Sequence, residues 1–472
     1  MPTSTSLHPP DESMTLPERG ALLHFIGIGG IGVSAVARLA LGQGYRIRGS
    51  DVRRSALTDT MARLGADVRI GHNAAHLDGV DAVVFSTAIP ETNVELAAAR
   101  AGGVPLLHRS ELLAAFVDAT ESIGVTGTHG KGTISSMIAH ILVEDGQDPG
   151  WIIGGIPMNY GRNAEGGAGR LLVAEVDESD GSHCNVRPRT LVCNFLEADH
   201  LNYYRDLDHI IETMARAISD NPRLESVWVN GDCPGNRRLA TLVSRPLGTY
   251  GVETDCDVRG SLRESGPEAI RFEVTAHGES LGEFRLQIPG TYNVVNALAA
   301  IAVSRELGVA PDVQRRALAT YRGLENRFTV RRAGGRTIVK DYNSHPTAMR
   351  KVLDFGREMG GRRIISIFKP YRYTLIHYLQ DEYATAFEGS EEVLITKMYA
   401  ADEDPIPGVD TAFFVRLLEQ AGQRVRHLHD ENEIVPWLAE NTGEGDLVFF
   451  FGGDDFFRMA DAWADALDAS NP

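Results

Sequence analysis

Short apolar runs and longer amphipathic segments alternate along the first quarter of the chain. The predicted elements are strands at 22–28, 46–51 and 81–86 and helices that end near residues 44 and 64. This alternation is typical of a parallel sheet covered by helices. We therefore predict an N-terminal Rossmann-like domain over residues 21–118. Residues 1–20 are polar, contain prolines and lack an apolar signal segment, and they are predicted to form a disordered leader.

A second α/β unit begins near residue 122 and a third near residue 330. The predicted elements are strands at 122–125, 171–177, 190–196, 337–341, 364–368, 392–396 and 447–451 and helices at 134–143, 207–218 and 293–307. Polar and apolar residues alternate between 257 and 288, which predicts antiparallel strands at one edge of the second sheet. We predict a central P-loop ATPase-like domain at 119–328 and a C-terminal Rossmann-like domain at 329–472, giving a three-domain α/β protein.

A glycine-rich segment with one lysine follows the first strand of the central unit and precedes a helix. It consists of Gly127, Thr128, His129, Gly130, Lys131, Gly132 and Thr133. In a strand–loop–helix arrangement, unpaired backbone N–H groups and the helix dipole face a bound anion. The segment therefore predicts a phosphate cradle with Lys131 on the phosphates. The residue after this lysine is normally Ser or Thr, whose hydroxyl binds Mg²⁺; here it is Gly132, so Thr133 is the nearest hydroxyl.

Acidic residues end two further strands of the central unit. Residues 175–180 read Glu-Val-Asp-Glu-Ser-Asp, and residues 197–200 read Glu-Ala-Asp-His. The carboxyl ends of strands in an open α/β sheet face the ligand crevice, where carboxylates can hold Mg²⁺ directly or through water. These residues predict a magnesium site that includes Glu175 and His200. A solvated acidic loop and a structural histidine are the alternative interpretations.

Another glycine-rich turn follows the first predicted strand. Gly27, Gly29 and Gly32, with Gly30 between them, satisfy the G-x-G-x-x-G pattern, and Asp51 ends the next strand. The glycines allow close approach to a pyrophosphate, and the acid can hold a ribose hydroxyl. The pattern leaves three interpretations open: NAD-type binding, another pyrophosphate ligand, or a structural turn.

The composition of the chain argues against several classes of binding partner. The formal charge of −18 disfavours nucleic acid and anionic membranes, because a diffuse negative field repels polyphosphate. The longest apolar stretches are too short for a transmembrane helix. The four cysteines form no CxxC pair, so neither a disulfide framework nor a cysteine zinc site is expected. The sequence predicts small-molecule substrates and a reducing, cytoplasmic location.

A series of motifs, in this order, resembles the Mur ligases, closest to the members that join L-alanine to UDP-N-acetylmuramate. The resemblance extends from about residue 22 to residue 467. The motifs are HFIGIGGIG at 24–32, GSD at 49–51, STAIPETNVEL at 86–96, GTHGKGT at 127–133, EVDESDGS at 175–182, LEADHLNYY at 196–204, YNVVNALAA at 292–300, NRF at 326–328, DYNSHPT at 341–347, KPYRYT at 369–374 and YAADEDPIPG at 399–408.

The resemblance implies an ATP- and magnesium-dependent ligase of peptidoglycan biosynthesis. Such an enzyme activates a carboxylate as an acyl phosphate, releases ADP and couples the acyl group to an amino acid. The three domains would hold the UDP-sugar, Mg-ATP and the amino acid, which reassigns the Gly27–Gly32 turn from NAD to the UDP pyrophosphate. The implied residues are Lys131 on the phosphates; Glu175 and His200 at magnesium; Asn293 and Asn296 near the adenosine; Arg327 at the hinge, reaching the phosphates; Asp341 beside the nucleotide; and Lys131, His200, His345 and Arg372 at catalytic positions. Thr133 is not part of that family set, but its hydroxyl could reach the magnesium through a shifted loop.

Four positions depart from the family pattern. Gly132 replaces the magnesium-binding hydroxyl residue, Phe195 replaces an Asn, Ser344 replaces the first His of His-His-Pro, and Leu375 replaces an Arg. Leucine cannot imitate the bidentate carboxylate contact of an arginine. Two alternatives therefore stay open: a diverged Mur-type ligase that couples another acid or amine in specialised metabolism, and a nucleotide-binding homologue without catalysis.

Overall fold

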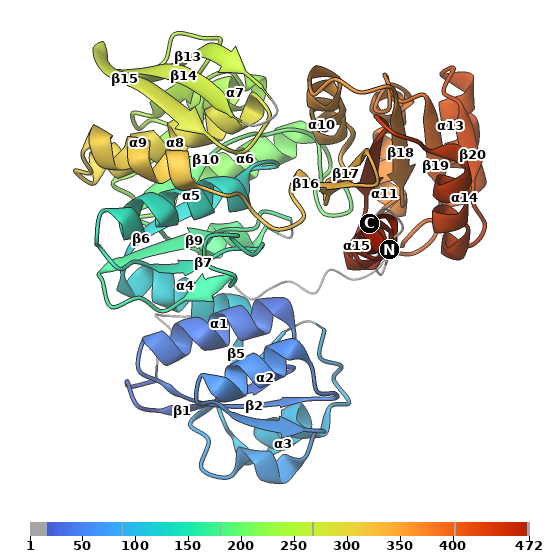
Figure 1. The fold of residues 1–472 in the computed structure, drawn as a ribbon. Coiled ribbons are helices and arrows are strands. Elements are labelled where there is room, and N and C mark those ends of the chain that lie inside the picture. Colours follow the sequence, from blue (N-terminus) through green and yellow to red (C-terminus); the bar gives the residue numbers. More distant parts are fainter. Residues whose placement is uncertain (1–16, 87, 180, 267–268, 401–402, 470–472) are drawn as a thin grey trace.

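Three α/β lobes, each built on its own sheet, follow one another along the chain (Figure 1). The computed structural model describes residues 17–86, 88–179, 181–266, 269–400 and 403–469. Most of the expected leader, residues 1–16, lies outside the described residues. The predicted fold class, three α/β domains with mainly parallel sheets, is confirmed. No helix among the described residues has both the length and the apolar character needed to cross a bilayer.

The N-terminal lobe contains a five-stranded sheet in the order β3-β2-β1-β4-β5, in which every neighbouring pair is parallel. Its elements are β1 (Leu22–Ile26), α1 (Ile31–Gly42), β2 (Arg46–Asp51), α2 (Ala56–Arg63), β3 (Asp67–Ile70), η1 (Ala74–Leu77), β4 (Ala82–Phe85), α3 (Val94–Gly102), β5 (Leu106–His108) and α4 (Arg109–Ala119). β3 and β5 were not predicted from the pattern of hydrophobic and polar residues. β3 is largely exposed and β5 is three residues long, so neither presents an apolar run.

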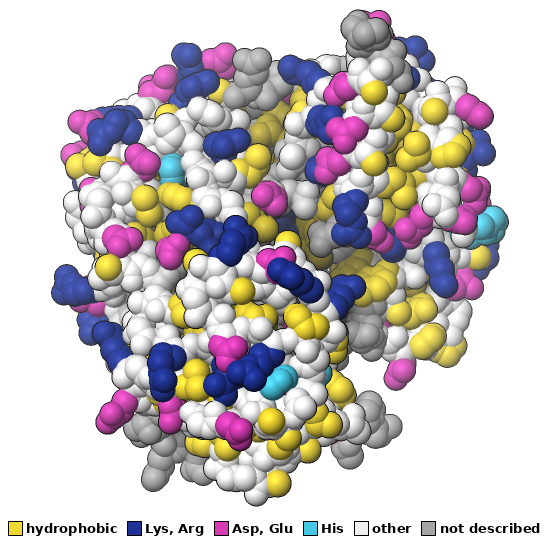
Figure 2. Space-filling view, turned by 60° about the horizontal axis from the view of Figure 1, so that its bottom comes forward, with side chains coloured by type: hydrophobic (Ala, Val, Ile, Leu, Met, Phe, Trp, Pro, Cys, Tyr) yellow, Lys and Arg dark blue, Asp and Glu magenta, His cyan; other side chains and the backbone are white. Residues whose placement is uncertain are grey.

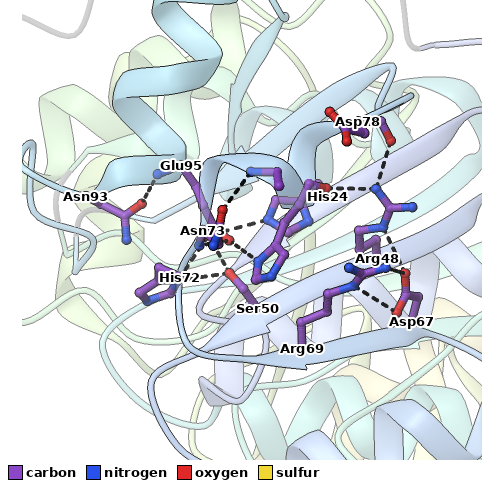
Figure 3. A network of polar contacts seen from close by, with 12 residues as sticks. His24, Arg48, Ser50, Asp67, Arg69, His72, Asn73, Asp78, Asn93 and Glu95 are labelled. Carbon is purple, nitrogen blue, oxygen red and sulfur yellow. Dashed lines mark hydrogen bonds and ion pairs between the residues drawn. The ribbon is translucent and has the colours of Figure 1, made fainter.

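A buried carboxylate fixes the strand ends of this lobe. Figure 3 shows Glu95 directed into a group that includes His24, His72 and Ser50. Glu95 Oε2 accepts a hydrogen bond from Ser50 Oγ (2.5 Å) and lies 3.0 Å from His72 Nδ1 and 3.4 Å from His24 Nε2, while His76 Nδ1 lies 2.6 Å from Oε1. The Glu95 side chain is fully buried. The Ser50 carbonyl accepts hydrogen bonds from the N–H groups of Gly27 and Ile28, which open the glycine turn after β1, so this network also supports that turn.

The central lobe contains a ten-stranded sheet in the order β15-β14-β13-β12-β11-β10-β6-β9-β7-β8. Its elements are β6 (Glu121–Thr126), α5 (Lys131–Glu144), β7 (Gly150–Ile152), β8 (Ala164–Glu165), β9 (Leu171–Glu175), η2 (Ser182–Asn185), β10 (Thr190–Cys193), α6 (Leu207–Ser219), β11 (Ser226–Asn230), α7 (Pro234–Leu242), β12 (Gly248–Gly251), β13 (Val258–Ser265), β14 (Ile270–Ala276), β15 (Glu279–Leu286), α8 (Tyr292–Glu306) and α9 (Pro311–Thr320). The predicted antiparallel edge is confirmed as β13–β15, and buried and exposed residues alternate along β14.

The N-terminal and central lobes share one hydrophobic core. Phe116 and Val117 of α4 pack in the same cluster as Ala174 of β9. Two glycines face each other at this boundary: a Cβ on Gly42 would overlap the Cα of Gly166. The backbones therefore approach more closely than any other residue pair would allow. This contact fixes α1 against the edge strand β8.

The C-terminal lobe contains a six-stranded sheet in the order β16-β17-β21-β18-β19-β20, with β16 antiparallel to β17. Its elements are β16 (Thr329–Ala333), β17 (Arg336–Asp341), α10 (Pro346–Glu358), β18 (Ile364–Phe368), α11 (Tyr373–Tyr378), α12 (Gln380–Ala384), β19 (Glu392–Ile395), α13 (Thr411–Gln420), β20 (Val425–His427), η3 (Glu431–Glu433), α14 (Ile434–Asn441), β21 (Leu447–Phe451) and α15 (Asp454–Ala469). β18 and β21 are buried along their whole length, which explains why their apolar runs marked them correctly.

Candidate active site

The glycine-rich loop lies at the point where the central sheet reverses its strand order. β6 runs between β10 and β9, and the loop leads from its carboxyl end into α5. Ligands of open α/β sheets bind at such a switch point. Gly127 and Gly130 have φ of 113° and 83°, and a Cβ on Gly130 would lie 2.5 Å from Asn194 Nδ2. Only glycine fits either position, so the loop conformation follows from its sequence.

Helix α5 begins at Lys131, three residues earlier than the pattern predicted. Gly130 is its N-cap, and no side chain caps the helix. The N–H groups of Lys131, Gly132 and Thr133 therefore belong to the first turn, where a helix has no internal acceptor for them. This arrangement can hold a phosphate.

The lysine of the loop is already paired with an acid. Lys131 Nζ donates to Glu178 Oε1 at 2.8 Å and to the Gly127 carbonyl at 2.9 Å. Burial opposes the charge of the ammonium group, but Glu178 and Asp177 outweigh it and raise the pKa of Lys131 above its usual value. Lys131 therefore stays cationic, as phosphate binding requires. From the sequence, Glu178 could be identified only as a member of an acidic cluster, because nothing in a loop pattern indicates which carboxylate turns toward the lysine.

Glu175, the last residue of β9, lies beside Gly132. Glu175 Oε2 accepts a hydrogen bond from the Gly154 N–H at 2.5 Å, and a Cβ on Gly132 would lie 3.1 Å from the same oxygen. Burial raises the pKa of Glu175, with the Lys131 charge acting in the opposite direction. A hydroxyl at position 132 would thus stand directly beside this carboxylate. Because residue 132 is glycine, it supplies no hydroxyl oxygen next to Glu175, the predicted magnesium ligand.

His200 and Glu178 form the second part of the acidic rim. His200 Nε2 lies 3.5 Å from Glu178 Oε1, and the ligand atoms of Asp177, Glu178 and His200 all lie within 4.8 Å of one another. Glu178 Oε2 is buried and has no hydrogen-bond partner in the described structure. Although burial acts against ionisation, Lys131 and His200 lower the pKa of Glu178 to about 2. An ionised carboxylate with a free buried oxygen fits a hard divalent cation.

The two asparagines expected near the adenosine lie beneath the loop. Asn296 Nδ2 donates to Asn293 Oδ1, and Asn194 Nδ2 donates to Asn296 Oδ1, each at 3.1 Å. Asn194 Nδ2 also donates to the His129 carbonyl at 2.9 Å, which connects the chain of amides to the loop. All three asparagines are buried. Asn194 precedes Phe195, the departure from the family pattern, so this lobe does present an amide to the loop, one residue earlier. Contact of Asn293 or Asn296 with a nucleotide remains a prediction.

The C-terminal lobe reaches the loop through a histidine. His345, the N-cap of α10, has Nε2 3.2 Å from the Ala198 carbonyl, and its ring packs against that of His129 with centroids 4.8 Å apart. His129 Nε2 in turn lies 3.2 Å from Glu197 Oε2. His345 therefore lies at the predicted site, although 214 sequence positions separate it from Lys131 and no local pattern indicates the contact.

The hinge between the central and C-terminal lobes is held by Asp341. Its carboxylate accepts the N–H groups of Phe328 (2.8 Å) and Asn343 (2.9 Å), and Arg327 Nη1 donates to Asn343 Oδ1 at 2.8 Å. Asn326 and Phe328 both adopt left-handed φ values, 57° and 48°. Asp341 therefore stabilises a strained hinge, and its expected contact with the nucleotide remains a prediction.

Arg372 lies in the C-terminal lobe with φ of 64° and pairs with an acid of its own lobe. Arg372 Nη1 lies 3.6 Å from Glu403 Oε1, and Glu403 also accepts from Thr374 Oγ1 at 2.6 Å. Leu375 packs against the hydrophobic core of the lobe. At Ser344, another position that departs from the family pattern, the backbone carbonyl accepts a hydrogen bond from the Tyr383 hydroxyl. The family pattern has arginines at the positions of Arg372 and Leu375, and in this chain only the first of these two positions carries one.

The turn at Gly27–Gly32 lies in the N-terminal lobe, apart from the loop at Lys131. The Gly29 N–H donates to Asp51 Oδ2 at 2.9 Å, so Asp51 shapes the turn itself. Gly30 is the N-cap of α1. A Cβ on Gly32 would lie 3.3 Å from a guanidinium nitrogen of Arg109, a cation that sequence reasoning missed. The turn and Arg109 together fit an anionic ligand, whereas a ribose contact by Asp51 remains a prediction.

Charge is otherwise dispersed. On the face shown in Figure 2, small groups of Lys and Arg side chains are interspersed with Asp and Glu side chains. Together with the net charge of −18, this distribution agrees with small-molecule substrates.

Comparison with known proteins identifies relatives along almost the whole chain. Three family models match consecutive segments: "Mur ligase family, catalytic domain" at residues 22–120, "Mur ligase middle domain" at 125–304 and "Mur ligase, glutamate ligase domain" at 326–453. A UDP-N-acetylmuramate–L-alanine ligase from Solibacter usitatus is 39% identical over 93% of this chain and 94% of its own. The corresponding ligase from Phenylobacterium zucineum is 38% identical over 95% of both chains. Among solved structures, the UDP-N-acetylmuramate–alanine ligase MurC from Thermotoga maritima aligns with a TM-score of 0.76 at 26% identity, covering 95% of this chain and 99% of its own.

Proposed function

This chain belongs to the Mur ligase family, and on that premise we propose that it joins L-alanine to the carboxylate of UDP-N-acetylmuramate with ATP as co-substrate. The observation that carries the proposal is the meeting of three elements at one place: the Lys131 loop, the acidic strand ends of β9 and β10, and His345 from the C-terminal lobe. A cytoplasmic location is part of the proposal, since ATP and a UDP-sugar are the substrates.

The chemistry follows from the weakness of a carboxylate as an acylating agent. Transfer of the γ-phosphoryl group to the carboxylate oxygen forms an acyl phosphate and releases ADP. The amine of the amino acid then attacks the acyl carbon, the C–N bond forms, and phosphate leaves with the oxygen it was bonded to. The Lys131 ammonium group offsets charge that would otherwise repel the carboxylate.

The remaining residues hold reactants and exclude water. Glu178, with its unpartnered Oε2, together with His200 and Glu175, would bind Mg²⁺, and Thr133, the first hydroxyl residue after Lys131 in the sequence, is the candidate to add a further oxygen. Magnesium bound there would neutralise charge on the transferred phosphoryl group. The contact of His345 with Ala198 brings the C-terminal lobe over the loop, which would shield the acyl phosphate from hydrolysis.

The direct test is ADP release from the full-length protein with ATP, magnesium, UDP-N-acetylmuramate and L-alanine. We expect Lys131→Met to slow this release at least about 100-fold, because it removes a charge that acts on the transferred group. Lys351→Met, on the exposed side of α10, is the matched control and should leave the rate unchanged. No ADP release from the wild type, or equal rates in both variants, would refute the proposal.

One observation favours a second candidate, a ligase for a different amine. Arg372 is already paired with Glu403, and Leu375 contributes to the hydrophobic core rather than to a polar site. An acceptor without an α-carboxylate would need no second arginine. The two candidates differ in ADP release with L-alanine compared with simple amines, and restored preference for L-alanine in Leu375→Arg would identify the missing contact. ATP binding without ADP release from any tested pair would instead indicate a homologue without catalysis.

A further inference from the structure

Three side chains of metal-binding type meet where the C-terminal lobe contacts the glycine-rich loop. His129 comes from the loop, Glu197 from the segment after β10, and His345 from the start of α10, and one ligand atom from each lies within 4.8 Å of the other two. The Asp177–Glu178–His200 group is a separate set of residues on the acidic rim. The proposed ligase chemistry does not require two imidazoles in the group formed by His129, Glu197 and His345.

The chemical state of these side chains suits a metal ion. His345 is 7% exposed, and its Nδ1 has no hydrogen-bond partner in the described structure, so a buried lone pair or N–H is left unsatisfied. Burial, and then the neighbouring His129, lower the pKa of His345, which keeps the imidazole neutral, the form that binds metals. Burial opposes ionisation of Glu197, but the contact with His129 lowers its pKa, so this carboxylate is an anion.

We propose that His129, Glu197 and His345 bind a borderline-soft divalent ion such as Zn²⁺ and thereby fasten the C-terminal lobe to the loop. Two imidazoles and one carboxylate are donors that zinc accepts, with water completing a tetrahedron. Ligand atoms of a tetrahedral zinc site lie about 3.4 Å apart, given Zn–N and Zn–O distances near 2.1 Å. The His129–Glu197 pair is already at 3.2 Å, and the ligand atom of His345, within 4.8 Å of both, would move closer by side-chain rotation when the ion binds. Magnesium prefers oxygen ligands and would remain at the acidic rim.

The proposal goes beyond the ligase function, because the ion would join two lobes that must separate for substrates to exchange. His129 lies between Thr128 and Gly130 of the loop, and His345 directly precedes α10. A bound ion would restrain both at once, and we expect it to slow turnover by holding the lobes closed.

The test measures zinc binding by full-length protein without nucleotide or magnesium, in competition with a chromophoric zinc indicator. We expect His345→Gln and Glu197→Gln each to lose one zinc equivalent or to weaken that site at least about 100-fold, beyond the effect typical of an outer-shell partner. His200→Gln, in the acidic rim, and His427→Gln, in the surface pair with His429, are the matched controls and should keep this site.

Three results would overturn the proposal: equal zinc binding by wild type and His345→Gln, loss of the equivalent only in a control variant, or no wild-type site tighter than about 10 µM, an affinity near −7 kcal/mol. Thermal melting with EDTA present checks that each variant is folded. Because Glu197 and His345 lie in different lobes, misfolding of one variant leaves the other to decide. Zinc should also slow amide hydrogen exchange at the start of α10 in the wild type but not in Glu197→Gln. None of these measurements requires ligase activity, so they are independent of the proposed function.

Discussion

The buried carboxylate of the N-terminal lobe makes that lobe sensitive to acid. Burial opposes ionisation of Glu95, but the nearby His24 ring, 3.4 Å away, and the hydrogen bond from Ser50 outweigh it and lower the pKa from 4.5 to about 2. A folded pKa below the unfolded one contributes stability that is complete above about pH 4.5 and is lost as the pH falls toward about 2. At about 1.4 kcal/mol for each pH unit, the full contribution is about 3 kcal/mol, of which about 2 kcal/mol disappears between pH 6 and pH 3.

The predicted perturbation is Glu95→Gln, which cannot ionise. We expect the free energy of opening of β1 and β2 to fall by about 2 kcal/mol more in the wild type than in this variant between pH 6 and pH 3. Amide hydrogen exchange of β1 and β2 peptides, read by mass spectrometry and corrected for intrinsic exchange rates, reports this lobe separately from the others. Glu91→Gln, an exposed carboxylate paired with Arg100, is the control and should follow the wild type. Parallel pH profiles for wild type and Glu95→Gln would refute the reasoning.

Three further variants test the candidate site and the lobe boundary. Gly132→Ser should lower the magnesium concentration for half-maximal ADP release about tenfold, because it places a hydroxyl beside Glu175. Gly132→Ala, which adds no hydroxyl, should leave this concentration unchanged. Equal magnesium dependence in the wild type and both variants would contradict the expectation. Glu178→Gln removes the carboxylate that pairs directly with the Lys131 ammonium group, and we expect a loss of about 3–5 kcal/mol in urea unfolding followed by tryptophan fluorescence; an unchanged midpoint would show that the pair is not formed. Gly166→Ala should cost about 1–3 kcal/mol and speed hydrogen exchange in α1, since its Cβ overlaps the facing backbone; unchanged exchange would rule out that close approach.

Local sequence determined most of the framework. Apolar runs that are buried on both faces, such as β18 and β21, were identified with correct bounds, and the alternation of β14 identified the antiparallel edge. One mostly buried strand with an apolar run, β11, was missed. Strands without an apolar pattern were missed as well: β12 reads Gly-Thr-Tyr-Gly, and β3 is mostly exposed. Their strand conformation depends on pairing with neighbours, which no local window contains.

The features of the candidate site also fall into two groups: those that the sequence predicts and those that depend on the tertiary structure. The glycine-rich loop could be recognised from sequence because its glycines and lysine are contiguous and its backbone conformation follows from residue type. Three contacts could not be predicted in this way: the pairing of Lys131 with Glu178, the hydrogen bond from Asn194 to the loop, and the packing of His345 against His129. Each depends on where a loop or a second lobe places its side chain.

The sequence by itself thus determined three α/β lobes, a glycine-rich loop at the start of a helix and an acidic rim, because each is specified by neighbouring residues whose periodicity or backbone freedom is a local property. Only the tertiary structure decided which acid neutralises the lysine, which amide supports the loop and which histidines meet across the lobes. The physical reason is that electrostatic and hydrogen-bond contacts act over a few ångströms in space, whatever the separation of the residues along the chain.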